Sequence, residues 1–136
     1  MRAPFPKGTI TSLYGATENR PNPHRGLDFG IPAGYPIRFG ANGTVMFVRW
    51  SDCLGWVISY RFLHKGKVLF AAHSHLRRKP KWKSGDKIMA EDIAGLVGNT
   101  GNCSRGAHDH LTIGPTAEHV FIGKTIDPLK VLEFDK

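Results

Sequence analysis

The sequence predicts an all-β domain of antiparallel strands, and two observations support this prediction. Sixteen glycines and nine prolines are spread along the 136 residues, and they leave little room between them for helices. Between these breakers, the segments 44–50, 55–62 and 68–73 are rich in the β-branched and aromatic residues that strands favour. Residues 51–54 form a short loop and 65–67 a hairpin turn, so we expect three consecutive antiparallel strands.

The rest of the chain contains shorter elements. Residues 85–86 (Gly-Asp) signal a turn, 93–97 a short strand, and 98–106 a loop rich in glycine and asparagine. Strand character resumes at 111–113, and only 126–132 offers room for a short helix. Helical structure is therefore expected only near the end of the chain.

Length and composition predict one folded domain that spans residues 1–136. A chain of this length buries a hydrophobic core without a second lobe, and 40% of its residues are hydrophobic. No run approaches the roughly 18 consecutive apolar residues of a membrane span, so none is expected. The first six residues lack the apolar core of a signal peptide, so the sequence predicts no secretion signal in this chain. We expect a monomer.

A formal net charge of +8, from 19 basic and 11 acidic residues, predicts a surface that attracts polyanions. Nucleic acid and the anionic polymers of a bacterial cell wall are the candidates. The sequence contains no zinc-finger spacing and no RNA-recognition signature, so we expect no specific nucleic-acid partner. The basic cluster at 77–83 is interpreted as a solvated loop.

The two cysteines, Cys53 and Cys103, form no close pair in the sequence, which argues against a thiolate metal site. A disulfide between them is one interpretation. Two unpaired small hydrophobic side chains are the other, and the sequence does not decide between the two.

Seven histidines are many for a small domain, and two clusters of them stand out. The first runs from His24 to Asp28, among prolines and glycines that exclude a continuous helix. In an extended chain, residues four apart share a face, so His24 and Asp28 converge on one point. The second cluster is His108-Asp109-His110, where alternation along a strand sends the two histidines to one side and Asp109 to the other.

Together the clusters predict a metal site. His24, Asp28 and one of the paired histidines supply two neutral nitrogens and one carboxylate, the ligand set of a catalytic zinc site with a fourth position open for water. One carboxylate leaves a Zn²⁺ ion with net positive charge, so the ion remains a strong Lewis acid that activates water near neutral pH. The other paired histidine, with one from 72–76, would serve as the proton shuttle.

With these residues the sequence resembles the lysostaphin-like, or LytM-type, family of zinc endopeptidases. The family signatures are a histidine and an aspartate spaced as in His24 and Asp28, a His-Leu segment as in His75-Leu76, and a His-x-His as in 108–110. Further motifs follow in the family's order, and the resemblance covers 10–129. They are Tyr14-Gly15, Pro32-Ala33-Gly34, Pro36-Ile37, Asn42-Gly43-Thr44-Val45, Gly85-Asp86 and Gly98-Asn99-Thr100-Gly101.

Carried over by position, the resemblance implies that His24, Asp28 and His110 bind one zinc ion. His108 would sit beside the attacking water. His75 would join it as general base and as stabiliser of the tetrahedral oxyanion, roles that suit an imidazole.

The resemblance also implies a substrate and a fold. The substrate is a peptide link of bacterial peptidoglycan, so the chain would be a metalloendopeptidase that acts on the cell wall. The fold is an antiparallel β architecture with a long groove walled by loops. Residues 51–54 and 98–106 would be two of those walls, which would bring Cys53 and Cys103 near one another.

Two positions depart from the family pattern. The residue between the paired histidines is usually apolar, but here it is Asp109, which needs a partner if it points inward. His73 stands where an aromatic residue is often found, and alternation puts it on the same strand face as His75, so it is a further candidate for the groove. His64 and His119 match nothing in the family and are interpreted as ordinary surface histidines.

Two other functions are weighed against this one. A family member that binds the wall or regulates a partner without cutting is disfavoured, because all three ligands and both shuttle histidines are present. A nucleic-acid-binding module is suggested only by the charge. The sequence leaves open whether a D-alanine cross-link or a glycine bridge is cut, and it favours a phage lysin over a secreted autolysin.

Overall fold

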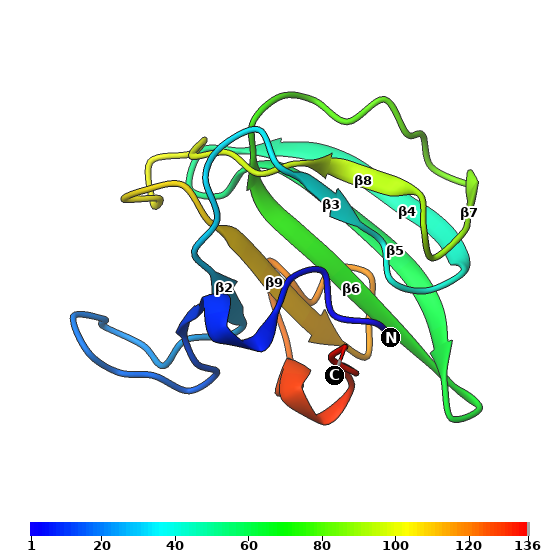
Figure 1. The fold of residues 1–136 in the computed structure, drawn as a ribbon, viewed down its shortest axis with the longest axis horizontal. Coiled ribbons are helices and arrows are strands. Elements are labelled where there is room, and N and C mark those ends of the chain that lie inside the picture. The colour runs from blue at the N-terminus through cyan, green and yellow to red at the C-terminus, as the bar shows by residue number, and fades with distance from the viewer. Residues whose placement is uncertain (136) are drawn as a thin grey trace.

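The computed structural model describes residues 1–135, which form two antiparallel sheets and contain no α-helix (Figure 1). The larger sheet has the strand order β1-β2-β9-β6-β5-β4-β7, and the smaller sheet pairs β3 with β8. The all-β antiparallel prediction is confirmed. The elements are η1 (Lys7–Thr9), β1 (Ile10–Ser12), β2 (Leu27–Phe29), β3 (Pro36–Arg38), β4 (Gly43–Ser51), β5 (Gly55–His64), β6 (Lys67–Leu76), β7 (Lys87–Ile88), β8 (Ile93–Leu96), β9 (Asp109–Gly114) and η2 (Pro128–Lys130).

The three consecutive strands predicted from the sequence lie next to one another in the larger sheet. β4, β5 and β6 pair consecutively and antiparallel, as expected from their β-branched and aromatic content. Lys65 and Gly66 connect β5 to β6 with φ angles of 50° and 79°, the type I′ conformation that matches the twist of the flanking strands. The predicted strand at 93–97 corresponds to β8, and the predicted short helix corresponds to the 3₁₀ turn η2.

The larger sheet buries side chains on both faces. In β5, Ile58 and Tyr60 point into the main core, whereas Val57, which precedes them, belongs to a smaller cluster on the opposite face. The smaller sheet packs on the main core through Ile37 and Ala94. Each large apolar side chain that is fully buried contributes about 1.5–3 kcal/mol. This core therefore holds in place the strands that carry the histidines.

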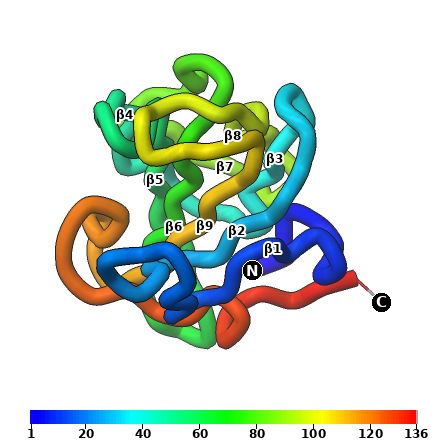
Figure 2. The backbone as a smooth tube through the Cα atoms, turned by 90° about the vertical axis from the view of Figure 1, so that its left-hand side faces the viewer, coloured from blue at the N-terminus to red at the C-terminus, as the bar shows by residue number. Residues whose placement is uncertain are grey.

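The segment 115–125 covers the opposite face of the sheet and is the orange loop in Figure 2. Its Val120 belongs to the same buried cluster as Val57. Arg25 anchors the segment, because its guanidinium donates hydrogen bonds to the carbonyl oxygens of His119 at 2.7 Å and Gly123 at 2.6 Å. A residue of the first histidine cluster therefore anchors a loop almost one hundred residues later in the chain.

His119 lies in this segment, and its prediction as a surface histidine is wrong. Its side chain is fully buried. Nδ1 donates to the carbonyl oxygen of Thr116 at 2.7 Å, and Nε2 accepts from the hydroxyl of Thr112 at 2.9 Å. Both ring nitrogens are satisfied, which is how a buried imidazole avoids the cost of lost hydration.

Two loops flank the place where β6 ends and β9 begins. Residues 13–24 (blue) and 98–106 (yellow) lie on the left of Figure 1, the side that faces the viewer in Figure 2. Across residues 1–135, the structure has no helix with the length and hydropathy needed to cross a bilayer.

Candidate metal centre

Asp28 and His110 are brought together by strand pairing. β2 and β9 are neighbouring antiparallel strands, and Asp28 stands directly opposite His110 in their register. Asp28 Oδ1 lies 2.8 Å from His110 Nδ1. Gly26, just before β2, makes this approach possible, because a Cβ atom there would lie 2.9 Å from His110 Cε1. The glycine between the two ligand positions therefore leaves room for the histidine ring.

His24 completes a triangle of ligand atoms. Its Nε2 lies 3.2 Å from His110 Nδ1 and 3.2 Å from Asp28 Oδ1. The backbone places His24 there, because its N–H donates to Ala16 and its carbonyl oxygen accepts from Gly15. The ligand atoms of these three residues all lie within 4.8 Å of one another.

The donor set fits a zinc ion. Ligands about 2.0–2.1 Å from a tetrahedral zinc lie about 3.3 Å from one another. The observed separations of 2.8 and 3.2 Å are close to that value. His24 Nδ1 lies 3.1 Å from the carbonyl oxygen of Leu13, which can only accept, so the proton is on Nδ1 and the Nε2 lone pair faces the site. Lone pairs that converge in this way form a site that a cation fits.

Asp28 carries the negative charge of the site. Burial alone would raise the pKa of its carboxyl group, but the neighbouring imidazoles of His110 and His24 outweigh burial and hold the pKa well below its usual range. Arg20 Nη2 lies 3.6 Å from Asp28 Oδ2 and donates to the Ser12 hydroxyl at 3.0 Å. The carboxylate is therefore ionised, as a metal ligand must be.

His75 and His108 lie beside this triangle with matching orientations. The ring centroids of His75 and His108 are 4.8 Å apart, and His108 Nε2 is 3.9 Å from Asp28 Oδ1. Each ring donates its Nδ1 proton to a backbone carbonyl oxygen at 2.7 Å, that of Thr100 for His75 and that of Gly106 for His108. Both rings therefore carry their lone pair on Nε2, the atom that accepts a proton.

His75 reaches this position through an unusual backbone conformation. Its φ angle is 60°, in the left-handed region that a residue other than glycine seldom adopts. Strand alternation would point His75 to the same face as His73, into the main core. The turned backbone instead directs the ring towards His108, and its N–H donates to the carbonyl oxygen of Leu54 at 2.6 Å.

The structure places His73 outside this group of histidines, so its prediction as a groove residue is wrong. The side chain is fully buried, and Nδ1 lies 2.8 Å from Asp109 Oδ1. The prediction assumed unbroken alternation from His73 to His75, which the left-handed conformation of His75 interrupts. Asp109 does point inward, and His73 is the partner that it requires.

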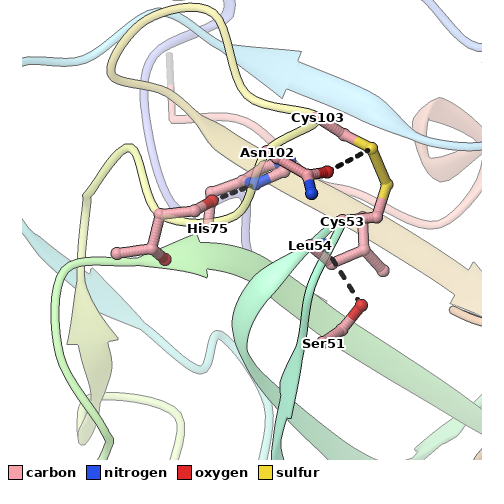
Figure 3. The surroundings of a disulfide bond; sticks show 7 residues. Ser51, Cys53, Leu54, His75, Asn102 and Cys103 are labelled. Atoms are coloured by element: carbon pink, nitrogen blue, oxygen red, sulfur yellow. Dashed lines mark hydrogen bonds between the residues drawn. A yellow bond between two sulfur atoms is a disulfide. The ribbon is translucent and has the colours of Figure 1, made fainter.

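A disulfide links the two cysteines and joins the loops that hold His75 (Figure 3). Of the two interpretations that the sequence left open, a disulfide and two unpaired cysteines, the structure has the disulfide. Cys53 neighbours Leu54, whose carbonyl oxygen accepts from His75 N–H. Cys103 lies in the 98–106 loop, which contains Thr100, the acceptor for His75 Nδ1. The backbone N–H of Cys103 also donates to the carbonyl oxygen of Cys53 at 3.0 Å.

Several residues that hold the site histidines in place belong to no recognisable sequence motif. Thr100 and Leu54 act through backbone carbonyl groups, which every residue type possesses. Arg25 lies inside the first histidine cluster, and that position is the one signal in the sequence of its anchoring role. Ser12 and Arg20 contact ligands from 11–20, where the sequence shows no histidine or aspartate.

Comparison with known protein families gives a match over most of the chain. The sequence model described as peptidase family M23 matches residues 22–127. The chain is 34% identical over 119 residues to an uncharacterized metalloprotease of Buchnera aphidicola, a match that covers 83% of this chain and 30% of that protein. It is 33% identical over 91 residues to the peptidoglycan DD-endopeptidase ShyA of Vibrio cholerae, covering 67% and 20%. The chain thus spans less than a third of the length of these curated relatives.

Solved structures share the fold. The catalytic domain of the antimicrobial peptidase lysostaphin from Staphylococcus simulans matches with a TM-score of 0.75 and 26% identity over 89% of both chains. A variant catalytic domain of the prophage-encoded M23 protein EnpA from Enterococcus faecalis matches with a TM-score of 0.74 and 29% identity, covering 93% of this chain and 94% of that one. The expected lysostaphin-type fold is confirmed.

Proposed function

The chain belongs to peptidase family M23, and we propose that it is a zinc-dependent endopeptidase that hydrolyses peptide links of bacterial peptidoglycan. The observation that carries the proposal is the triangle formed by His24 Nε2, Asp28 Oδ1 and His110 Nδ1. Two neutral nitrogens and one carboxylate oxygen are the donor set of a catalytic zinc site. A zinc ion held by these residues would act as a Lewis acid that polarises the scissile carbonyl group and acidifies water.

His75 and His108 supply the proton transfers in this proposal. Each presents an unprotonated Nε2, because each Nδ1 proton is bound to a backbone carbonyl oxygen. One ring takes the proton of the attacking water and passes it to the amine nitrogen of the leaving group. The other, when protonated, donates a hydrogen bond to the oxyanion that develops on the carbonyl oxygen.

The low basicity of His75 is consistent with these roles. Burial is the main reason that the pKa of His75 falls from its ordinary value of 6.5 to about 4, and the neighbouring rings of His110 and His108 lower it further. The ring therefore stays neutral at neutral pH, with its lone pair free. A protonated His75 gives its proton up readily, which favours transfer to a leaving amine.

The substrate assignment is supported by the relatives. ShyA is a peptidoglycan DD-endopeptidase by name, and lysostaphin is an antimicrobial peptidase. The net charge of +8 also suits a wall that carries anionic polymers. We propose that residues 1–136 form one domain that acts as a monomer on the bacterial cell wall. The likeness to a prophage-encoded protein supports a phage lysin. The alternative is a family member that binds the wall without cutting it.

Muropeptide release tests the proposal. Zinc-loaded protein is incubated with purified walls that contain either direct cross-links or glycine bridges, and the soluble products are identified by mass spectrometry. We expect new peptide termini from at least one wall type with wild type and with His64→Ala, a surface control, and none with His110→Ala. Wall binding without any new terminus would instead support the non-catalytic alternative.

A further inference from the structure

A chain of three polar side chains crosses the main core directly behind the histidine site. Asp109 Oδ1 lies 2.8 Å from His73 Nδ1, and His73 Nε2 lies 2.9 Å from the Tyr60 hydroxyl. That hydroxyl donates to the carbonyl oxygen of Phe39 at 2.9 Å. Asp109, His73 and Tyr60 are all 0% exposed. They come from β9, β6 and β5, which are consecutive neighbours in the sheet.

The hydrogen bonds can be assigned from the protons available. The carbonyl oxygen of Phe39 can only accept, so the single hydroxyl proton of Tyr60 points to it. Burial, and then the charge of Asp109, raise the pKa of Tyr60 well above its ordinary value, so this proton stays on the phenol. The Tyr60 oxygen then accepts from His73 Nε2–H. One further proton is shared between His73 Nδ1 and Asp109 Oδ1.

A buried polar network of this kind is not expected to make the core more stable than apolar side chains would. Buried polar groups cost desolvation free energy, and Asp109 Oδ2 has no hydrogen-bond partner among the described residues. Apolar side chains of similar volume often match or exceed the stability of a buried ion pair. Apolar contacts do not specify an orientation. A hydrogen bond constrains the distance and angle between its donor and acceptor, and so the relative placement of the two strands that carry them.

The network lies next to the backbone that carries the histidines of the site. Asp109 stands between His108 and His110 in the sequence, and it faces the opposite way. His73 is two residues before His75, and the adjacent Ser74 pairs with His110 across β6 and β9. The bond from Asp109 to His73 therefore ties together the two backbone stretches that carry His75, His108 and His110.

We propose that Asp109 and His73 are positioning residues, whose buried hydrogen bond sets the placement of His108 and His110 relative to His75. The proposal rests on the proposed function, because it assigns these histidines to metal binding and proton transfer. Neither residue touches the reacting groups, since both lie on the core side of the sheet.

The test replaces the pair by apolar residues. His73→Phe and Asp109→Leu each leave one buried polar partner unpaired, so each single variant should melt at a lower temperature than wild type. The double variant removes both polar groups and should recover most of the melting temperature. If the pair positions the site, the double variant still binds zinc about 10–100-fold more weakly, the range seen when groups that orient ligands are lost. Its kcat should fall more than its KM changes.

Two further variants keep the result decisive. Asp109→Asn keeps a hydrogen bond to His73, because its amide Nδ2–H can donate to the lone pair on His73 Nδ1, so its zinc affinity should stay close to that of wild type. It also reports on the bond if the double variant does not fold. Phe62→Leu disturbs the same core at the far end of β5 and should lower the melting temperature without changing zinc affinity. Zinc affinity is measured by competition with a chromogenic chelator.

The outcomes separate this inference from the proposed function. A folded double variant with the zinc affinity and kcat of wild type overturns the positioning role, as does an Asp109→Asn variant that binds zinc as weakly as Asp109→Leu. If wild type itself binds no zinc or cuts no wall peptide, the proposed function fails instead.

Discussion

His75 and His108 face each other with ring centroids 4.8 Å apart, although His75 lies near the end of β6 and His108 precedes β9. Each is fixed by a hydrogen bond from Nδ1 to a backbone carbonyl oxygen, so neither depends on the metal ligands for its orientation. The three proposed metal ligands and the two proposed proton-transfer histidines are therefore separable, and substitutions in one set should leave the other intact.

The first prediction uses this separation. His75→Ala should retain zinc, because His75 is not part of the ligand triangle, and should lose about 10²–10⁴-fold in kcat, the usual contribution of a general acid or base. Zinc content and the rate of peptide release are measured on the same sample, with His64→Ala as the control. A fully active His75→Ala variant would remove His75 from the mechanism.

The second prediction concerns the stability of the metal-free protein as a function of pH. In the unfolded chain His75 titrates near 6.5, whereas burial lowers its pKa to about 4 in the folded protein. Below pH 6.5 the unfolded state therefore binds the proton first, and the free energy of unfolding falls as the pH drops towards 4. Above pH 6.5 both states are neutral at this position, and the contribution is constant.

Denaturant titrations at several pH values, in the presence of a chelator, measure this effect. His75→Gln removes the titrating group, so its free energy of unfolding should depend less steeply on pH between 6.5 and 4 than that of wild type. Burial also lowers the pKa of His119, so some dependence should remain in the variant. Identical slopes for wild type and variant would contradict the account of His75.

The third prediction concerns the disulfide. Removing it as Cys53→Ser/Cys103→Ser releases a cross-link across 50 residues and should lower stability by about 2–4 kcal/mol. The two loops also hold His75 through Leu54 and Thr100, so kcat should fall in the variant while zinc affinity stays unchanged. Thermal melting, zinc competition and turnover are compared with wild type. Zinc affinity that falls in parallel with kcat would show that the loops support the metal triangle instead.

The fourth prediction concerns Arg25. Its guanidinium donates to the carbonyl oxygens of His119 and Gly123 at once, a geometry that a lysine ammonium group does not reproduce. Arg25→Lys should therefore loosen the segment 115–125, seen as faster amide hydrogen exchange there than in β5. Unchanged exchange in the segment would mean that packing around Val120 is sufficient to hold it.

The parts of the site that were predictable are those that depend on local periodicity. His108 and His110 flank Asp109 on a strand, so alternation alone separates the histidines from the aspartate. The convergence of His24 with Asp28 follows similarly from an extended segment without a helix. The central strands were predictable because their β-branched and aromatic content is strong and the turns between them are short.

The parts that were missed depend on tertiary contacts. The left-handed conformation of His75 arises where its backbone bonds to Leu54 and its ring to Thr100, and no local pattern signals this. That one dihedral angle explains why the His75 ring turns towards His108 instead of lying in the core with His73. The burial of His119 depends on Thr112, a partner on another element.

Equilibrium dialysis of the purified protein against zinc, followed by metal analysis, tests the central claim most directly. We expect one zinc ion per chain for wild type and for His75→Ala, and none for His24→Ala, Asp28→Ala or His110→Ala at the same free zinc concentration. Wild-type protein that binds no zinc, or triangle variants that bind it as tightly as wild type, would contradict the claim.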